Sequence, residues 1–159
     1  LGRLMLGEKC HLPCTPSAVM TIIEEYKIPL TGQKVCMIGR SNIVGKPLSL
    51  LLTHQHATVT LCHSRTADLK GECLSSDIVV AAIGKTRFVK GDWIKPGAVV
   101  IDVGTNYTEN GLAGDVDFEA AKDIASRITP VPGGVGSLTN AILMKNCLEA
   151  YESQITRGG

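Results

Sequence analysis

The stretch Gly39-Arg40-Ser41-Asn42-Ile43-Val44-Gly45-Lys46-Pro47 decides the fold of this chain. It follows an apolar segment, 35–38, that predicts a short strand, and it leads into a segment, 44–53, that predicts a helix. A tight glycine turn between a strand and a helix presents backbone N–H groups and the positive end of the helix dipole to a phosphate. The stretch therefore predicts a nucleotide-binding unit.

The glycine spacing alone is a weak signature of dinucleotide binding. Gly39 permits the turn, but Ser41 stands where the fingerprint G-x-G-x-x-G has its second glycine, and Gly45 comes one residue later than the third. The alternative interpretation is a simple strand-to-helix turn. The stretch 39–47 follows the first strand of a predicted sheet, and this position favours nucleotide binding over a simple turn.

The end of the second predicted strand, 57–62, indicates which dinucleotide is bound. NAD enzymes usually place an acidic residue there to bind the ribose 2′-hydroxyl, but residues 40–67 contain none. Arg40, Ser64 and Arg65 instead suit the negative charge and acceptor oxygens of a 2′-phosphate. The alternative is an exposed polar turn. The pattern favours NADP over NAD.

Strands and helices alternate along most of the chain. Apolar, β-branched runs predict strands at 35–38, 57–62, 78–82, 98–101 and 128–129. Helical spacing and caps predict helices at 15–27, with Thr15 as N-cap, and at 44–53, 69–75, 90–94, 117–125 and 138–151. We therefore predict an α/β fold, a Rossmann-like doubly wound, mostly parallel sheet with flanking connector helices.

Three regions follow from this pattern. Residues 1–30 form a connector helix region, 31–136 an NADP-binding domain, and 137–159 a C-terminal helix with a tail, 156–159, that we expect to be disordered. The chain begins with Leu1 rather than Met, and we interpret it as part of a longer protein.

Composition excludes several other classes of protein. The net charge of +1 and the scarcity of aromatic residues argue against a nucleic-acid partner. No apolar run reaches the roughly 20 residues of a membrane helix, and no secretory signal is visible. Cys36 and Cys62 in predicted core strands indicate a reducing compartment and a cytoplasmic location. Cys10, His11 and Cys14 lack a second ligand pair, so we predict no metal site.

Further candidate groups follow the third and fourth strands. Gly84 and Gly104 lie where the strands end, at the sheet edge where ligands of open α/β sheets bind. Asp102 and Asp115 are either catalytic carboxylates or braces of loops and helix ends, and we favour braces. The loop 130–136 combines two prolines with three glycines before a helix, which favours contact with an anionic or carbonyl-bearing ligand; a rigid interdomain connector is the alternative.

Together these motifs resemble the methylenetetrahydrofolate dehydrogenase/cyclohydrolase family. The resemblance rests on three motifs in order, Gly-Arg-Ser-x-x-Val-Gly-x-Pro at 39–47, Ala-Thr-Val-Thr-x-Cys-His-Ser-Arg-Thr at 57–66 and Pro-Val-Pro-Gly-Gly-Val-Gly at 130–136. It also includes Leu-Pro-Cys-Thr-Pro at 12–16 and Gly-Arg-Leu at 2–4, so it covers nearly the whole chain.

The resemblance implies a homodimeric, two-domain enzyme that oxidises 5,10-methylenetetrahydrofolate with NADP and hydrolyses the methenyl product to 10-formyltetrahydrofolate. Arg40 and Ser41 would then lie on the cofactor phosphates, Ser64 at the 2′-phosphate, and the backbone around Thr105 at the nicotinamide. The residues implied to touch the folate are Pro132, Gly133, Gly134, Val135 and Gly136.

The chain also departs from the family. The family's catalytic lysine lies in a Tyr-x-x-x-Lys motif, and none of the three tyrosines here starts one. We therefore assign no catalytic residue to this chain. Thr105 stands where the family usually has isoleucine, and Ser137-Leu138 where it usually has Pro-Met.

Two other functions stay open at this point. One is an NADP-dependent dehydrogenase of the shikimate or amino-acid type, which needs a lysine–aspartate pair and a small acid as substrate. The other is a non-catalytic nucleotide-binding module. A mitochondrial or plastid location also stays open, because a transit peptide would precede Leu1.

Overall fold

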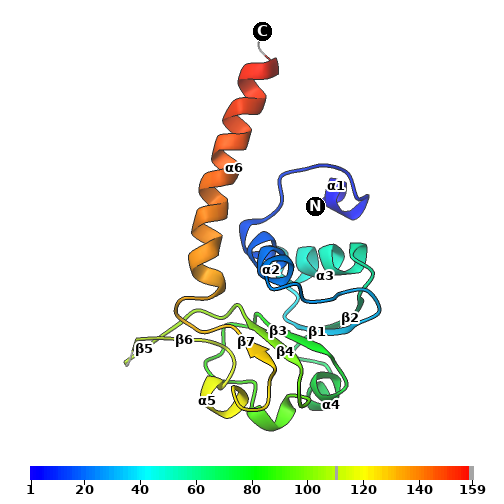
Figure 1. Ribbon diagram of the computed structural model, residues 1–159, viewed down its shortest axis with the longest axis vertical. Coiled ribbons are helices and arrows are strands. Elements are labelled where there is room, and N and C mark those ends of the chain that lie inside the picture. Colours follow the sequence, from blue (N-terminus) through cyan, green and yellow to red (C-terminus); the bar gives the residue numbers. More distant parts are fainter. Residues whose placement is uncertain (110, 158–159) are drawn as a thin grey trace.

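A five-stranded parallel sheet forms the centre of the molecule in this computed structural model, which describes residues 1–109 and 111–157 (Figure 1). Its strands are β1 (Lys34–Ile38), β2 (Thr58–Cys62), β3 (Ile78–Ala81), β4 (Val99–Asp102) and β7 (Arg127–Ile128). Their order is β2-β1-β3-β4-β7, and all neighbours are parallel. The chain adds β2 on one side of β1 and β3 on the other, so β1 and β3 flank the topological switch point. The predicted doubly wound fold is confirmed.

Both faces of the central strands β1, β3 and β4 are buried, which explains why these strands are nearly all apolar, whereas Thr58 and Thr60 of the edge strand β2 are exposed. Because side chains alternate along a strand, Val35 and Met37 of β1 face one layer while Cys36 and Ile38 face the other. The first layer contains α2 (Cys14–Glu25), α3 (Gly45–His54) and the base of α6 (Val135–Arg157). The second contains α4 (Leu69–Leu74), the 3-10 turn η1 (Gly91–Trp93) and α5 (Phe118–Ala121) (Figure 1).

Three cysteines meet in the second layer. Cys36 Sγ donates a hydrogen bond to Cys62 Sγ at 3.7 Å and lies 3.9 Å from Cys73 Sγ. All three side chains are fully buried. The hydrogen bond with Cys73, together with burial, raises the pKa of the Cys36 thiol, so it stays protonated at neutral pH. All six cysteines of the chain are free thiols.

The first and last long helices pack against each other on one side of the sheet. Asn146 of α6 donates from Nδ2 to the carbonyl oxygen of Leu12 at 3.2 Å, just before α2 begins. Beyond this contact α6 projects away from the sheet, and the short helix α1 (Gly2–Met5) lies beyond α3 (Figure 1). Within the described residues, no helix is long and apolar enough to span a membrane.

Several helix boundaries differ from the sequence prediction. Thr15 is not the N-cap of α2, because the first turn closes on Pro13, whose carbonyl accepts from Ser17 N–H at 3.1 Å. The helix predicted for 117–125 ends at Ala121. Three residues after this end, the carbonyl oxygen of Ile124 accepts from Gly97 N–H at 2.9 Å. This hydrogen bond lies outside the helix, in the segment that leads to β7.

The C-terminal helix also differs from its prediction. α6 starts at Val135 rather than 138, and it includes residues 156 and 157, for which we predicted disorder. The rest of the predicted tail, 158–159, lies outside the described residues.

A two-stranded antiparallel hairpin was not predicted. It joins β5 (Asn106–Thr108) to β6 (Gly111–Ala113) and stands clear of the main sheet (Figure 1). Its side chains hold it in place: Asn106 Nδ2 donates to Ala113 O at 3.3 Å and Thr108 Oγ1 to Gly111 O at 2.8 Å. The hairpin extends one wall of the sheet edge at which the candidate residues lie.

Candidate functional site

The turn after β1 depends on two close backbone approaches. Gly39 has a φ of +120°, and a Cβ there would lie 2.2 Å from the carbonyl oxygen of Ala82. A Cβ on Gly45 would lie 1.9 Å from the carbonyl oxygen of Gly39. Only glycine therefore lets the first turn of α3 pack directly over the end of β1. This packing aims the N-terminal end of α3 at the carboxyl edge of the sheet.

Ser41 holds the turn that leads into helix α3, whose N-cap is Val44. Its Oγ accepts from the backbone N–H groups of Val44 at 3.1 Å and Gly45 at 3.3 Å. Its backbone carbonyl accepts from Lys46 N–H at 3.0 Å. The hydroxyl therefore satisfies two N–H groups at the start of the helix, and only its own hydrogen is left to donate to a ligand.

Basic and hydroxyl groups follow two adjacent strands. Arg40 comes directly after β1, and Ser64 and Arg65 follow β2; Gly39 N–H donates to Cys62 O at 2.9 Å, which joins the two strand ends. All three of these side chains are exposed. Within the described part of the chain, neither guanidinium group nor the Ser64 hydroxyl has a hydrogen-bond or ion-pair partner. These groups are therefore available to an anion.

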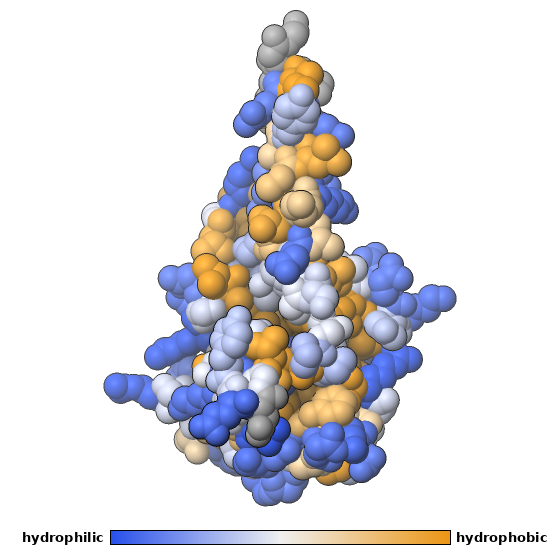
Figure 2. Space-filling model, turned by 90° about the vertical axis from the view of Figure 1, so that its left-hand side faces the viewer, coloured by the Kyte–Doolittle hydropathy of each residue, from blue (hydrophilic) through white to orange (hydrophobic). Residues whose placement is uncertain are grey.

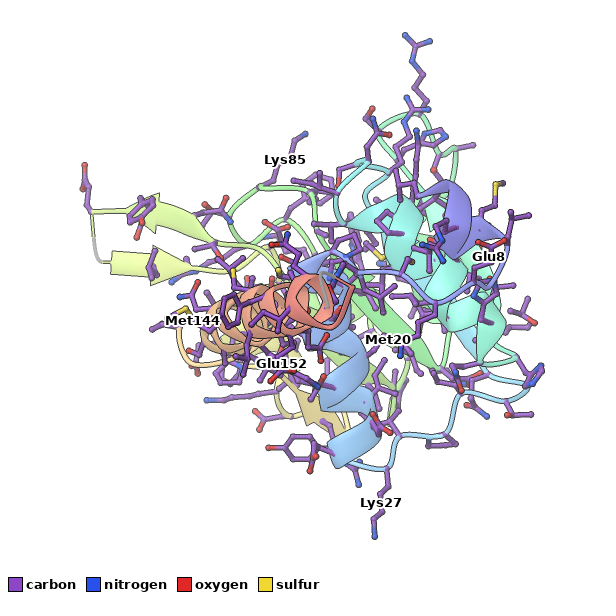
Figure 3. All side chains as sticks on the ribbon, turned by 90° about the horizontal axis from the view of Figure 1, so that it is seen from above. Glu8, Met20, Lys27, Lys85, Met144 and Glu152 are labelled. Atoms are coloured by element: carbon purple, nitrogen blue, oxygen red, sulfur yellow. The ribbon has the colours of Figure 1, made fainter. Side chains whose placement is uncertain are left out.

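The turn that carries Ser64 and Arg65 is held by its own side chains. His63 N–H donates to Thr66 Oγ1 at 2.9 Å, and Arg65 N–H donates to His63 Nδ1 at 3.1 Å. His63 and Thr66 thus shape the turn and leave its two central side chains free. Lys85, after β3, projects from the molecule near the same edge, with Nζ 5.2 Å from the centre of the Phe88 ring (Figure 3).

Two buried carboxylates brace the loops after β3 and β4. Asp102 accepts from the backbone N–H groups of Gly104 and Asp115 at 2.9 Å each and of Val116 at 2.8 Å. Asp115 accepts from four N–H groups at 2.6 to 3.0 Å, those of Ile83, Gly84, Lys85 and the Asn106 side chain. Burial raises the pKa of Asp102 above its ordinary value. Because their oxygens accept these N–H groups, both carboxylates hold the loops together, which is the bracing arrangement described as one of the two alternatives.

A cleft of about 270 Å³ opens between β4, the hairpin and the base of α6. Thr105 lines one part of it and is exposed. The predicted folate loop lines another part, and its Val131–Pro132 peptide bond is cis. The remaining lining residues include Leu112, Ser137 and Asn140. The structure thus brings Thr105 and the loop residues Pro132, Gly133, Gly134, Val135 and Gly136 together around one cleft, beyond the ends of β4 and β7.

Leu112 and Asn140 were missed by the sequence analysis. Leu112 belongs to the unpredicted hairpin. Asn140 lies three residues after Ser137 on α6, so helical spacing would have placed both on one face once the helix was started at Val135.

A larger cleft, of about 640 Å³, lies beside β7 and contains none of the predicted phosphate-binding residues. It runs between α2, β7 and the base of α6, and its walls are mostly apolar, with Ile22, Ile28 and Leu138 among them. Cys10 and His11 line a third cleft, of about 300 Å³, between α2 and α6. Both clefts are lined by residues of α2 and α6, and neither is lined by residues of the Gly39 turn.

The fold and the sheet edge define a nucleotide-binding domain of the doubly wound class. The chain belongs to a family within that class, the tetrahydrofolate dehydrogenase/cyclohydrolase NAD(P)-binding domain, which it matches over residues 13–155. It is 55% identical over 155 residues to the bifunctional protein FolD of Acetivibrio thermocellus, covering 97% of this chain and 54% of that protein. The chain thus spans about half the length of the curated relatives it matches.

Solved structures agree with this assignment. The bifunctional FolD enzyme of Campylobacter jejuni superposes with a TM-score of 0.93 at 42% identity, covering 96% of this chain and 55% of that one. The FolD of Trypanosoma brucei, solved in complex with NADP and an inhibitor, gives 0.90 at 41% identity, covering 97% and 56%. Membership of this family argues against the alternative of a dehydrogenase of the shikimate or amino-acid type.

Proposed function

We propose that this chain is the NADP-binding part of an enzyme that oxidises 5,10-methylenetetrahydrofolate to the methenyl compound and hydrolyses that product to 10-formyltetrahydrofolate. Relatives with about twice the length of this chain carry the name of a bifunctional protein. The observation that carries the cofactor assignment is the unpaired Arg40, Ser64 and Arg65 beside a glycine turn that aims a helix end at them.

The residues present fit a dinucleotide whose ribose carries a 2′-phosphate. The backbone of the Gly39–Gly45 turn would receive the pyrophosphate at the N-terminal end of α3, with the Ser41 hydroxyl as an additional donor. Arg40, Ser64 and Arg65 would bind the 2′-phosphate through charge-assisted hydrogen bonds. When bound, NADP supplies the acceptor for the hydride.

The rest of the sheet edge supports the folate part of the proposal. Thr105 and the loop 132–136 surround one cleft at the far end of the edge from Arg65. The buried carboxylates Asp102 and Asp115 hold the loops beside this cleft in fixed positions. This chain would thus orient the cofactor and one side of the substrate, while acid–base groups come from another part of the protein.

Calorimetric titration of the chain with NADP and, separately, with NAD tests the cofactor assignment. We expect NADP to bind at least tenfold more tightly at low salt, because a surface phosphate pairs with two guanidinium groups. The double variant Arg40→Ala/Arg65→Ala should remove that preference while NAD binding changes little. Raising the ionic strength should reduce the preference as well.

Arg3→Ala is the matched control, since Arg3 is an exposed arginine on α1 that pairs with Glu8 at 3.1 Å. It should leave the preference for NADP intact. Equal affinities of the unmodified chain for NADP and NAD would contradict the proposal, as would a preference that survives the double variant.

The remaining parts of the proposal concern the assembly and its location. The resemblance to homodimeric enzymes supports a homodimer for the whole protein. Six free thiols, three of them buried within hydrogen-bonding distance of a neighbour, support a reducing compartment, and we propose the cytoplasm.

A further inference from the structure

We infer that Thr105, Ser137 and Asn140 together form a hydrogen-bonding wall that binds the amide group of a planar ring. All three line the cleft of about 270 Å³ beyond the ends of β4 and β7. Thr105 comes from the loop after β4, and the other two come from the first turns of α6. This inference rests on the proposed function. It adds side-chain contacts for Thr105, whose backbone alone was given a role, and for Ser137 and Asn140, which were given none.

The described lining of the cleft offers no free charge to a ligand. Asp102 is the only charged residue in that lining, and its carboxylate accepts hydrogen bonds from the backbone N–H groups of Gly104, Asp115 and Val116. Most of the other lining residues are glycine, proline and valine. A carboxylate or phosphate would therefore find no counter-ion side chain among these residues, in contrast to the arginines at the ends of β1 and β2.

Three side chains in this cleft have unused hydrogen-bonding groups. Within the described residues, the Thr105 and Ser137 hydroxyls and the Asn140 amide make no hydrogen bond. Neighbouring polar side chains are paired: Thr139 Oγ1 donates to Val135 O at 2.9 Å, and Thr129 Oγ1 accepts from Asp102 N–H at 2.8 Å. The three unpaired groups all belong to residues that line the cleft, whereas Thr129 and Thr139, whose hydroxyls are paired, are not among its lining residues.

The chemistry of the three groups matches an amide. Hydroxyls both donate and accept, and the Asn140 side chain supplies a carbonyl oxygen and an NH₂ group. A ring amide presents N–H and C=O side by side, so such a wall can pair both. In the proposed reaction two ligands carry this group, the carboxamide of nicotinamide and the lactam edge of a pterin. An apolar lining of leucine or isoleucine could only exclude water. The three polar side chains can also select a ligand that carries an amide.

The test compares ligands that carry or lack the amide. The variants Thr105→Val, Ser137→Ala and Asn140→Leu remove the polar groups with little change of shape, and the triple variant combines them. Each is titrated with NADP, with the 3-acetylpyridine analogue of NADP, and with adenosine 2′,5′-bisphosphate, which has no such ring. Tetrahydrofolate is titrated into the NADP-loaded chain. Thr139→Val is the matched control, because its hydroxyl bonds within α6.

We expect the triple variant to weaken NADP or tetrahydrofolate binding about tenfold, since several neutral hydrogen bonds are lost. A loss for NADP that shrinks for the 3-acetylpyridine analogue assigns the wall to nicotinamide. A loss confined to tetrahydrofolate assigns it to the pterin. Unchanged affinities for both, or an equal loss for adenosine 2′,5′-bisphosphate, would overturn the inference. The proposed function fails by a separate result, namely that the unmodified chain binds adenosine 2′,5′-bisphosphate no more tightly than adenosine 5′-monophosphate.

Discussion

At the scale of single residues, the nucleotide turn depends on what Gly39 and Gly45 lack. Their absent side chains allow the β1 end, the loop after β3 and the start of α3 to pack within van der Waals contact. Ser41 completes the turn, because its hydroxyl oxygen accepts from the N–H groups of Val44 and Gly45, so a residue that departs from the usual glycine fingerprint has a structural use of its own.

Gly45→Ala tests this packing. The new Cβ would overlap the Gly39 carbonyl oxygen, so we expect the free energy of unfolding to fall by about 2–3 kcal/mol. Gly136→Ala is the matched control, because a Cβ on this α6 residue would meet no atom within 4 Å, and alanine there should add about 0.4–1 kcal/mol. Urea denaturation of the three proteins measures both changes. A neutral Gly45→Ala would mean that the turn does not need this close contact.

The residues of the site were predicted unevenly. Arg40, Ser64 and Arg65 were found because their place after predicted strands fixes the sheet edge at which they lie. The number of N–H groups that Asp102 and Asp115 accept from could not be predicted, since most of the donors belong to other segments of the chain, such as Ile83 for Asp115 and Val116 for Asp102. Asn140 was missed because the start of α6 was placed three residues too late.

At the scale of elements, strands were predicted better than helix ends. A strand buried on both faces is a continuous apolar run, so β1, β3 and β4 are visible in the sequence. The hairpin β5–β6 has strands of only three residues that lie outside the main sheet, and no periodic pattern marks it. The end of α5 is set by hydrogen bonds to the segment before β4, which local sequence does not encode.

The amino ends of the strands are joined by one carboxylate. Asp77, just before β3, accepts from Lys34 N–H of β1 at 2.9 Å and from Lys95 Nζ, near the start of β4, at 2.7 Å. Lys95 and the Lys34 N–H hold the pKa of Asp77 below its ordinary value. A carboxyl group whose pKa is lower in the folded state stabilises that state above the unfolded pKa, and this stabilisation is lost as the pH falls through the folded pKa.

We expect Asp77→Asn to lower the free energy of unfolding at pH 7 by about 0.5–1 kcal/mol, the range of exposed ion pairs. The difference from the unmodified chain should shrink below the ordinary carboxyl pKa of 3.8. Denaturation at a series of pH values measures it, and a double-mutant cycle with Lys95→Met separates the ion pair from the Lys34 contact. A difference that is the same at pH 7 and pH 3 would show that Asp77 acts through packing alone.

At the scale of the whole molecule, α6 carries an apolar stripe that nothing in the described structure covers. Met144, Leu148, Tyr151 and Ile155 follow each other at helical spacing and are all more than half exposed. Met144 lies on the side of α6 away from α2 (Figure 3). Apolar surface continues up the helix on the face shown in Figure 2. Exposed apolar surface of this kind favours association.

We expect the chain alone to self-associate through this stripe. Met144→Lys/Leu148→Glu should shift light-scattering masses toward the monomer at high concentration and leave the thermal midpoint unchanged. Ile142→Glu is the contrasting variant, because Ile142 is only 9% exposed and packs in the first layer; it should destabilise the fold by more than about 2 kcal/mol. Masses that are unchanged in the double variant would place the association surface elsewhere.

The three sulfurs of Cys36, Cys62 and Cys73 have a consequence for the protein's lifetime. Because all three are closed off from solvent, they react slowly with electrophiles while the domain is folded. Oxidation of these three sulfurs is therefore concentrated in two periods, before the newly made chain has folded and when the folded domain briefly opens. The rate at which an alkylating reagent modifies these three sulfurs thus reports how often the domain unfolds, so the buried thiols serve as an internal probe of its unfolding rate.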